Sequence, residues 1–266
     1  MKTKTLTIVG CGGLANLVVD AMIDGLLPNY QLIGTMSRTL AKASYLADKI
    51  NSAQNEYRCE AFDDTDQLLA LKPDYIVETA SPDAFKGFAL DALKNGSSII
   101  TLSIGAFADE EFYKNVQQVA DENNVKVYIA SGAIGGLDVL RTASLMYKSK
   151  ATFTTQKGPA SLRDSEVYDT ALENEEREVF KGNATGAIAL FPHKVNVSVA
   201  ASIASVGPEE MEVSINSIPN YVGDRHTITI KNEEIDAEIS VYSKTAAIAG
   251  WSVVNTLRNI ASPIVF

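Results

Sequence analysis

Short apolar runs alternate with amphipathic segments over the first 130 residues of the chain. TLTIVG (residues 5–10) is typical of a buried strand, and the apolar positions of residues 14–26 recur at helical spacing. The same alternation predicts strands at 30–37, 75–81, 98–103 and 126–131, and helices at 40–50, 82–96 and 108–124. Strand–helix repetition of this kind predicts a parallel sheet covered by helices on both faces.

The pattern changes after about residue 150. Runs with alternating apolar and polar residues, bounded by turn residues, predict strands at 151–158, 175–184, 210–218, 226–232 and 237–243. Helical spacing returns around 196–205, and an apolar helix is predicted over 244–260. We therefore expect a mainly antiparallel sheet in this half of the chain.

A glycine-rich loop follows the first predicted strand and opens the first predicted helix. Its sequence, GCGGLA, fits G-x-G-x-x-A. Gly10 permits the tight turn, Gly12 lets a pyrophosphate approach the backbone, and Ala15 lets the helix pack close to the sheet. The phosphates would lie at the helix N-terminus, beside Gly13 and Leu14. The alternative is a strand–helix turn that binds no ligand.

These patterns predict an α/β protein of two domains. Residues 1–130 would form a dinucleotide-binding Rossmann domain with a doubly wound parallel sheet. Residues 131–243 would form a second, α+β domain with a mainly antiparallel sheet. The C-terminal segment 244–266 is expected to pack back onto the first domain, because its helix is too apolar to remain exposed.

The residues after the second strand bear on the choice of cofactor. NAD enzymes usually carry an acidic residue there, which binds the ribose hydroxyls. This chain has Ser37, Arg38 and Thr39 instead. A guanidinium flanked by hydroxyls suits a 2′-phosphate, so the cofactor is predicted to be NADP or NAD, with NADP favoured. The alternative is an exposed arginine that stacks on the adenine, as NAD enzymes can also have.

Composition excludes several classes of function. The formal net charge is −10 and there is no basic run, so no nucleic-acid partner is expected. The two cysteines, Cys11 and Cys59, provide neither a disulfide framework nor metal-ligand spacing, and no metal is predicted. We found no signal peptide and no run of 18 apolar residues, so a cytoplasmic protein without a membrane partner is expected.

A second glycine-rich loop, SGAIGGLDVL (131–140), follows the last strand of the first half. This loop resembles the signature of the L-aspartate dehydrogenase family, and the resemblance extends over essentially the whole chain. The other stretches that carry it are VETASP (77–82), SIGAFAD (103–109), KGPASL (157–162), FPHKVNVSVAAS (191–202), DRHTITI (224–230) and SKTAAIAGWSVVNTLRNI (243–260).

The resemblance implies the oxidative deamination of L-aspartate to iminosuccinate, with hydride transfer to nicotinamide. The imine is then hydrolysed to oxaloacetate and ammonia, or passed to quinolinate synthesis in NAD biosynthesis. It also implies a homodimer in which residues 131–243 form the substrate and dimerisation domain. The other expected partner is a small-molecule substrate.

His226 corresponds to the family's catalytic histidine, with Asp224 two residues before it. One group that titrates near neutrality can deprotonate the amine and later activate water. The other histidine, His193, is expected to be a surface side chain. Asn196 and Ala133 correspond to cofactor contacts, and Asn196 could cap a helix instead or as well. Further cofactor positions in the matching motifs are Ala80, Ser81 and Ala106.

L-Aspartate brings two carboxylates that must be bound. Candidates are the second glycine loop and the start of the C-terminal helix, where Lys244 would provide charge. The residues concerned are Ser131, Gly132, Ile134, Gly135, Lys244 and Thr245. The alternative for Lys244 is a solvated lysine at a helix start. The chain departs from the family in lacking the acidic residue after the second strand, in Ser243 where the family has Pro, and in Lys194 where it has Asn.

Rival functions remain. The glucose–fructose oxidoreductase class resembles residues 77–100 but places a catalytic lysine where this chain has TLSIGAFAD. The glycine loop and the His226 strand also weaken a homoserine-dehydrogenase-like interpretation. An oxidoreductase acting on another small amino acid or hydroxy acid, or a non-catalytic dinucleotide sensor, stays open.

Overall fold

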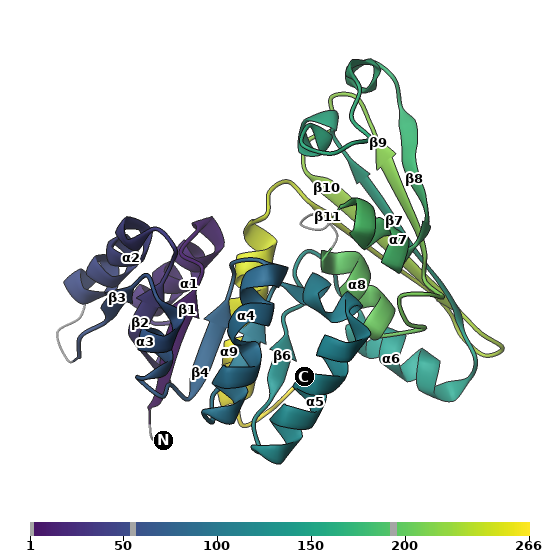
Figure 1. Cartoon of the computed structure of the whole chain (residues 1–266). Helices are drawn as coiled ribbons and strands as arrows, with labels where there is room; N and C mark the ends of the chain where they lie inside the picture. Colours follow the sequence, from purple (N-terminus) through teal and green to yellow (C-terminus); the bar gives the residue numbers. More distant parts are fainter. Residues whose placement is uncertain (1–2, 54–56, 192–195) are drawn as a thin grey trace. The chain divides into compact units, whose positions relative to one another are not determined.

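The chain folds into two compact units in the computed structural model, which describes residues 3–53, 57–191 and 196–266 (Figure 1). The first unit comprises residues 1–130 and 249–266, and the second comprises residues 131–248. The C-terminal helix therefore belongs to the same unit as the N-terminal sheet.

A six-stranded parallel sheet with strand order β3-β2-β1-β4-β5-β6 forms the centre of the first unit. Its strands are β1 (Lys4–Val9), β2 (Tyr30–Met36), β3 (Glu60–Phe62), β4 (Tyr75–Glu78), β5 (Ser98–Thr101) and β6 (Val127–Ile129). Its helices are α1 (Gly13–Ile23), α2 (Leu40–Ala53), α3 (Thr65–Leu69), α4 (Pro82–Lys94), the 3-10 turn η1 (Ile104–Ala108), α5 (Glu110–Glu122) and α9 (Ala247–Ala261). This is the doubly wound order that the alternating pattern predicts, so the predicted fold class is confirmed.

The core of the first unit joins residues that are distant in sequence. Leu6 and Ile8 of β1 and Val18 of α1 are fully buried in the same cluster as Val253 and Leu257 of α9. The Tyr30 hydroxyl donates a hydrogen bond of 2.8 Å to the carbonyl of Leu257. The apolar face of α9 is therefore part of the core.

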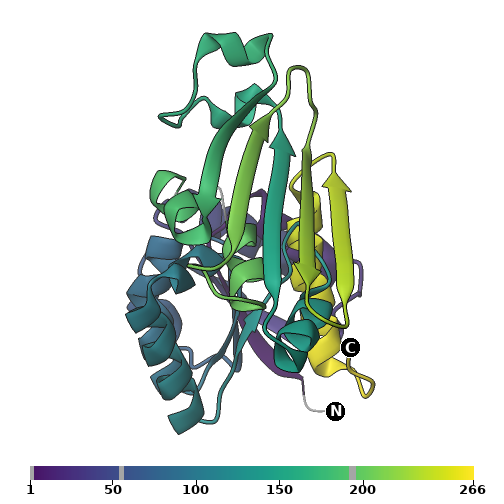
Figure 2. The ribbon, with the colours of Figure 1, turned by 90° about the vertical axis from the view of Figure 1, so that its right-hand side faces the viewer.

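A five-stranded sheet with strand order β11-β10-β7-β9-β8 forms the second unit, and Figure 2 shows its strands side by side. The strands are β7 (Lys150–Lys157), β8 (Arg177–Asn183), β9 (Glu212–Ser217), β10 (Asp224–Lys231) and β11 (Asp236–Ser243). Three pairs are antiparallel, but β7 and β9 are parallel. The sheet is thus mixed. β8 and the two helices that follow it lie between β7 and β9 in the chain, and they bring the chain back to the end of the sheet at which β7 began.

Helices of the second unit cover one face of this sheet. They are α6 (Leu137–Met146), α7 (Ala184–Leu190) and α8 (Asn196–Ile203); two 3-10 turns, η2 (Pro159–Leu162) and η3 (Thr170–Glu173), lie between β7 and β8. α6 contacts β10, α7 contacts β8 and β9, and α8 contacts β7. Alternate residues are buried along β7 from Ala151 and along β10 from His226, including Phe153, Ile228 and Ile230. The strands therefore have one buried face and one more exposed face.

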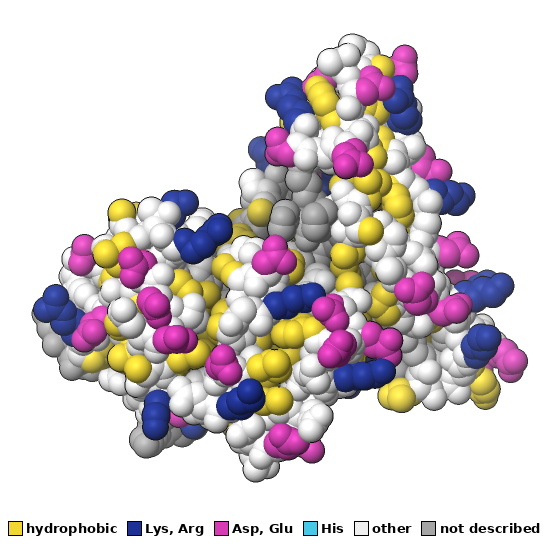
Figure 3. Space-filling view, viewed as in Figure 1, with side chains coloured by type: hydrophobic (Ala, Val, Ile, Leu, Met, Phe, Trp, Pro, Cys, Tyr) yellow, Lys and Arg dark blue, Asp and Glu magenta, His cyan; other side chains and the backbone are white. Residues whose placement is uncertain are grey.

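Charged residues are mixed on the face drawn in Figure 3, where lysines and arginines stand among aspartates and glutamates. This distribution agrees with a chain that carries 33 acidic and 23 basic side chains. Within the described residues, no helix is long and apolar enough to cross a membrane.

Candidate active site

The glycines of the first loop have different surroundings. Gly10 has φ +94°, and a Cβ there would lie 2.6 Å from the backbone nitrogen of Ala80. At Gly12 and Gly13, by contrast, a Cβ would meet no described atom within 4 Å. Packing within the unit therefore requires a glycine at position 10, while positions 12 and 13 border open space.

The N-terminus of α1 borders the same open space. Gly12 is its N-cap, and no described side chain caps the helix or places an acidic group in its first turn. The first backbone N–H groups, including those of Gly13 and Leu14, are therefore available to an anion, which the helix dipole also favours. These observations fit the pyrophosphate of a dinucleotide.

Glu78, which sequence reasoning did not single out, lies at the end of β4 and organises the neighbouring loops. Its carboxylate is fully buried and accepts hydrogen bonds from Ala80 N at 2.7 Å, Thr101 Oγ1 at 2.6 Å and Ser103 Oγ at 2.8 Å. Burial raises the pKa of this carboxyl, and the hydrogen bonds oppose the shift. Its position at the carboxyl end of a parallel strand is the signal that could have identified it.

The other predicted cofactor residues of the first unit occupy the ends of its strands. Ala80 is exposed, and Ser81 caps α4 by accepting a hydrogen bond of 3.2 Å from Ala84 N. Ala106 is buried within η1, so only its backbone could approach a ligand. After β2, Arg38 and its neighbour Thr39 are exposed, and Ser37 Oγ accepts a hydrogen bond of 3.3 Å from Thr39 N.

The second glycine loop connects β6 with α6 and belongs to the second unit from Ser131 onward. Gly132 and Gly136 have φ values of +63° and +70°, which explains glycine at both positions. At Gly135 a Cβ would meet no described atom within 4 Å. The N–H of Ile134 is donated to the carbonyl of Ser131 at 3.2 Å, so this N–H closes the turn and is not free for a substrate.

Ala133 and Asn196 are also in the second unit. Ala133 is half-buried in the loop, and Asn196 is the first residue of α8. His193 and Lys194 lie outside the described residues.

His226 lies on the buried face of β10 and is 5% exposed. Strand register places it opposite Thr155 of β7, and its Nδ1 lies 2.9 Å from Thr155 Oγ1. Its ring stacks on Phe153, with ring centres 5.6 Å apart. Since Nδ1 is engaged by Thr155, Nε2 is the nitrogen left for a reacting group.

Three influences act on the pKa of His226. Burial lowers it, the nearby Asp224 carboxylate raises it, and the positive charge of Lys157 lowers it, giving a pKa of about 4. The imidazole is therefore neutral at physiological pH, which is the form that can accept a proton.

Lys157 is a further buried residue that sequence reasoning did not assign. It ends β7, is 6% exposed, and its Nζ lies 4.0 Å from Asp224 Oδ1. The strand's alternation could have identified it, because Lys157 shares the apolar face with Phe153 and Thr155. A lysine on the buried side of a strand is unusual and points to a specific role.

A cavity of about 270 Å³ opens at this end of the sheet, wholly within the second unit. It brings Asp224 together with the predicted substrate residues Lys244 and Thr245, which are exposed at its edge. Its remaining lining residues are Gly158, Ala160, Ser161, Tyr221, Gly223, Ser243 and Ala246.

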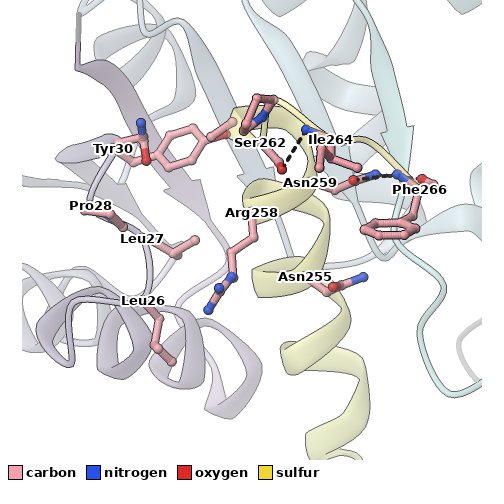
Figure 4. Close-up of a pocket in the computed structure, with 13 residues that line it drawn as sticks. Leu26, Leu27, Pro28, Tyr30, Asn255, Arg258, Asn259, Ser262, Ile264 and Phe266 are labelled. Carbon is pink, nitrogen blue, oxygen red and sulfur yellow. Dashed lines mark hydrogen bonds between the residues drawn. The ribbon is translucent and has the colours of Figure 1, made fainter. Parts of the chain in front are cut away.

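A larger pocket, of about 440 Å³, lies elsewhere in the first unit (Figure 4). It is formed by residues 26–30, which lead into β2, and by residues of the C-terminal half of α9 and of the segment that follows this helix. The side chain of Asn259 anchors Phe266 through two hydrogen bonds of 2.8 and 2.9 Å. Ligands of open α/β sheets bind at the carboxyl ends of the strands, so this pocket at an amino end is not the candidate site.

No group of three metal-ligating side chains occurs in the part of the chain that the structure describes.

Comparison with known proteins finds one matching family model for each half of the chain. The model of the aspartate dehydrogenase C-terminal domain matches residues 138–260, and the model of the homoserine dehydrogenase NAD-binding domain matches residues 10–130. L-Aspartate dehydrogenase of Methanococcus maripaludis is 31% identical over 267 residues, and that of Methanosarcina acetivorans is 32% identical over 269 residues. Each alignment covers 97% of both chains.

Solved structures lead to the same family. The crystal structure of aspartate dehydrogenase from Thermotoga maritima has a TM-score of 0.76 and 28% identity, over 99% of both chains. A hyperthermophilic archaeal homoserine dehydrogenase in complex with NADPH has a TM-score of 0.64 at 14% identity, over the whole of both chains, and shares the fold. The chain belongs to the L-aspartate dehydrogenase family.

Proposed function

We propose that this protein oxidises L-aspartate to iminosuccinate with NAD or NADP as hydride acceptor. The observation that carries the proposal is His226, a buried and neutral imidazole held by Thr155 on the face of the sheet that carries Lys157. Family membership supports the same reaction, since relatives of similar length bear the name L-aspartate dehydrogenase.

The first unit would hold the dinucleotide. The backbone at Gly12, Gly13 and Leu14 would bind the pyrophosphate, because it combines open space with unpaired helix N–H groups. Ser37, Arg38 and Thr39 would contact the adenosine ribose, and Ala80, Ser81 and the backbone of Ala106 would border the remainder. In the second unit, Ala133 and Asn196 are proposed to contact the nicotinamide portion. When bound, the oxidised nicotinamide supplies the hydride acceptor.

His226 is the proposed general base. Hydride can leave the Cα of an amino acid only when the amine carries its lone pair, so an ammonium group must first lose a proton. Nε2 of a neutral His226 can take that proton. Hydride loss leaves an iminium carbon, to which water adds. Once His226 has released its first proton to solvent, it can accept the proton that the water loses and return it to the departing amine. Collapse of the adduct releases ammonia and oxaloacetate.

The preference for NADP is a finer proposal. Arg38 is exposed at the end of β2, where no acidic side chain follows the strand. Replacing Arg38 with Asp would remove the charge partner of a 2′-phosphate and supply a carboxylate for ribose hydroxyls. We expect kcat/KM for NADP to fall by roughly 100-fold, since a charge-assisted contact is lost and a repulsion gained. A variant with unchanged NADP/NAD selectivity would contradict this assignment.

The state of assembly is also a proposal. A homodimer in the cytoplasm agrees with the family resemblance, and the more exposed face of the five-stranded sheet offers a surface for it. Light scattering by the purified protein should give twice the chain mass of 28.6 kDa. A monomeric mass would contradict the dimer while leaving the chemistry untouched.

The direct test is to follow the reduction of NAD and NADP by absorbance at mildly alkaline pH, with L-aspartate as the sole amino acid. We expect aspartate-dependent reduction that is faster with NADP. Dinucleotide binding without turnover would favour a sensor, and turnover of another amino acid or of a 2-hydroxy acid instead of aspartate would correct the substrate.

A further inference from the structure

A polar cluster interrupts the apolar face of the five-stranded sheet at its end. Its members are Lys157 of β7, Ser217 of β9 and Asp224 of β10. Strand register places Lys157 directly opposite both Ser217 and Asp224, and His226 lies one step further along the same face of β10. Because side chains two residues apart on a strand share a face, the three members of the cluster and His226 are neighbours.

Burying the polar groups of this cluster has an unfavourable free energy, because they lose water as a hydrogen-bond partner. Lys157 is 6% exposed, and Ser217 is fully buried with no hydrogen-bond partner for its hydroxyl among the described residues. A buried hydroxyl without a partner is unfavourable, because it has lost its hydrogen bonds to water. A buried ammonium beside an unsatisfied hydroxyl is a pair of donors suited to an anion.

Asp224 is the acidic member of this cluster. Its carboxylate is 4.0 Å from Lys157 Nζ, which is the outer limit of an ion pair, and its side chain is 39% exposed. Asp224 also lines the cavity of about 270 Å³, as does Gly158, the residue that follows Lys157. The cluster is therefore next to the cavity that contains Lys244 and Thr245.

We propose that Lys157, supported by Ser217, binds one carboxylate of the substrate beside His226. This inference rests on the proposed function, and it names the residue that selects an acidic substrate. Lys244 is exposed at the cavity edge, so its charge is screened by water and suits attraction of the anion better than tight binding.

The same arrangement links substrate binding to the base. Lys157 lowers the proton affinity of His226 by its charge, and a substrate carboxylate beside Lys157 would offset that charge. His226 would then become a stronger base when the amino acid is present.

The test compares Lys157→Met and Ser217→Ala with Lys150→Met, a matched control at the exposed opposite end of β7. Lys157→Met should raise KM for L-aspartate by roughly 100-fold and Ser217→Ala by roughly fivefold, as expected for a charged and a neutral hydrogen bond. KM for the dinucleotide should stay within about twofold of the wild-type value in all three, which also shows that the variants fold. Lys157→Arg, which keeps the charge, should recover part of the loss.

Calorimetry with succinate separates this inference from the proposed function. Succinate has both carboxylates of aspartate but cannot be oxidised at an amine-bearing carbon. The dinucleotide-loaded wild type should bind it, and Lys157→Met should lose that binding, even if L-aspartate proves not to be the substrate. An unchanged KM for L-aspartate and unchanged succinate affinity in Lys157→Met would overturn the assignment, as would a wild type that neither oxidises L-aspartate nor binds succinate.

Discussion

At the scale of single residues, the environment of His226 supports its proposed role as a general base. The ring is stacked on Phe153 and hydrogen-bonded to Thr155, so its orientation is fixed before a substrate arrives. Burial and the charge of Lys157 both favour the neutral imidazole. A general base needs both properties, because it must be oriented and must have a free lone pair.

This environment predicts how stability depends on pH. The pKa of His226 is about 4 in the folded chain and 6.5 in the unfolded chain. Between these pH values, the unfolded chain binds a proton that the folded chain does not. The free energy of unfolding should therefore fall as the pH falls from 6.5 to about 4, by up to about 3 kcal/mol from this group. Below that window the contribution stays constant.

Chemical denaturation of the wild type and of His226→Asn at several pH values measures the effect. The stability difference between the two should shrink steadily with acidification through the window. A pH-independent difference between wild type and His226→Asn would show that His226 titrates normally.

Some residue roles were predictable from sequence and others were not. The glycines of the first loop and the candidate base were identified from motif and resemblance. The contacts of His226 with Thr155 and Phe153 depend on the antiparallel register of β10 with β7, which sequence periodicity alone does not specify. Lys157 was overlooked because a lysine at the end of a predicted strand is normally solvated.

At the scale of elements, the first glycine loop separates folding from binding. Gly10→Ala should destabilise the first unit by about 2–4 kcal/mol, because it forces a side chain into a left-handed backbone and against Ala80. Gly12→Ala should leave the melting temperature nearly unchanged, since its Cβ would meet no described atom. It should nevertheless weaken dinucleotide binding by at least about tenfold, because the pyrophosphate needs that space.

Thermal melts without ligand and dinucleotide titrations distinguish the two variants. If Gly12→Ala binds NAD and NADP as tightly as the wild type, the pyrophosphate lies elsewhere.

The C-terminal helix α9 offers a second element-scale prediction. Leu257 is fully buried in the core that includes β1 and α1, whereas Trp251 of the same helix is 45% exposed. Leu257→Ala should cost about 2–4 kcal/mol of unfolding free energy through lost burial and the cavity left behind. Trp251→Ala is the control, and denaturant unfolding should show it to be much less destabilising. Equal losses would mean that α9 is held by other contacts.

Most elements follow from the hydrophobic pattern, with boundaries that differ by a few residues. The short strand β3 and helix α3 were not predicted, because segments of three and five residues carry too little periodicity. The helices α6 and α7 were missed because strand patterns dominate the residues around them. The parallel pairing of β7 with β9 was also not predicted, because alternation gives strands but not their partners.

At the scale of the whole molecule, the candidate cofactor loop and the candidate base lie in different units. The first has the doubly wound sheet and open glycine loop that suit a dinucleotide, and the second has the histidine, the buried lysine and the cavity next to them. The relatives named above match over nearly the entire chain, and therefore over both units.

The most direct test of this account is the stoichiometry of the reaction in the wild type and in His226→Asn. With L-aspartate and NADP, the wild type should release one ammonia for each dinucleotide reduced. His226→Asn should still bind the dinucleotide but lose at least about 1,000-fold in kcat, as expected for removal of a general base. Ammonia release at the wild-type rate by the variant, or dinucleotide reduction without ammonia in the wild type, would contradict the proposed chemistry.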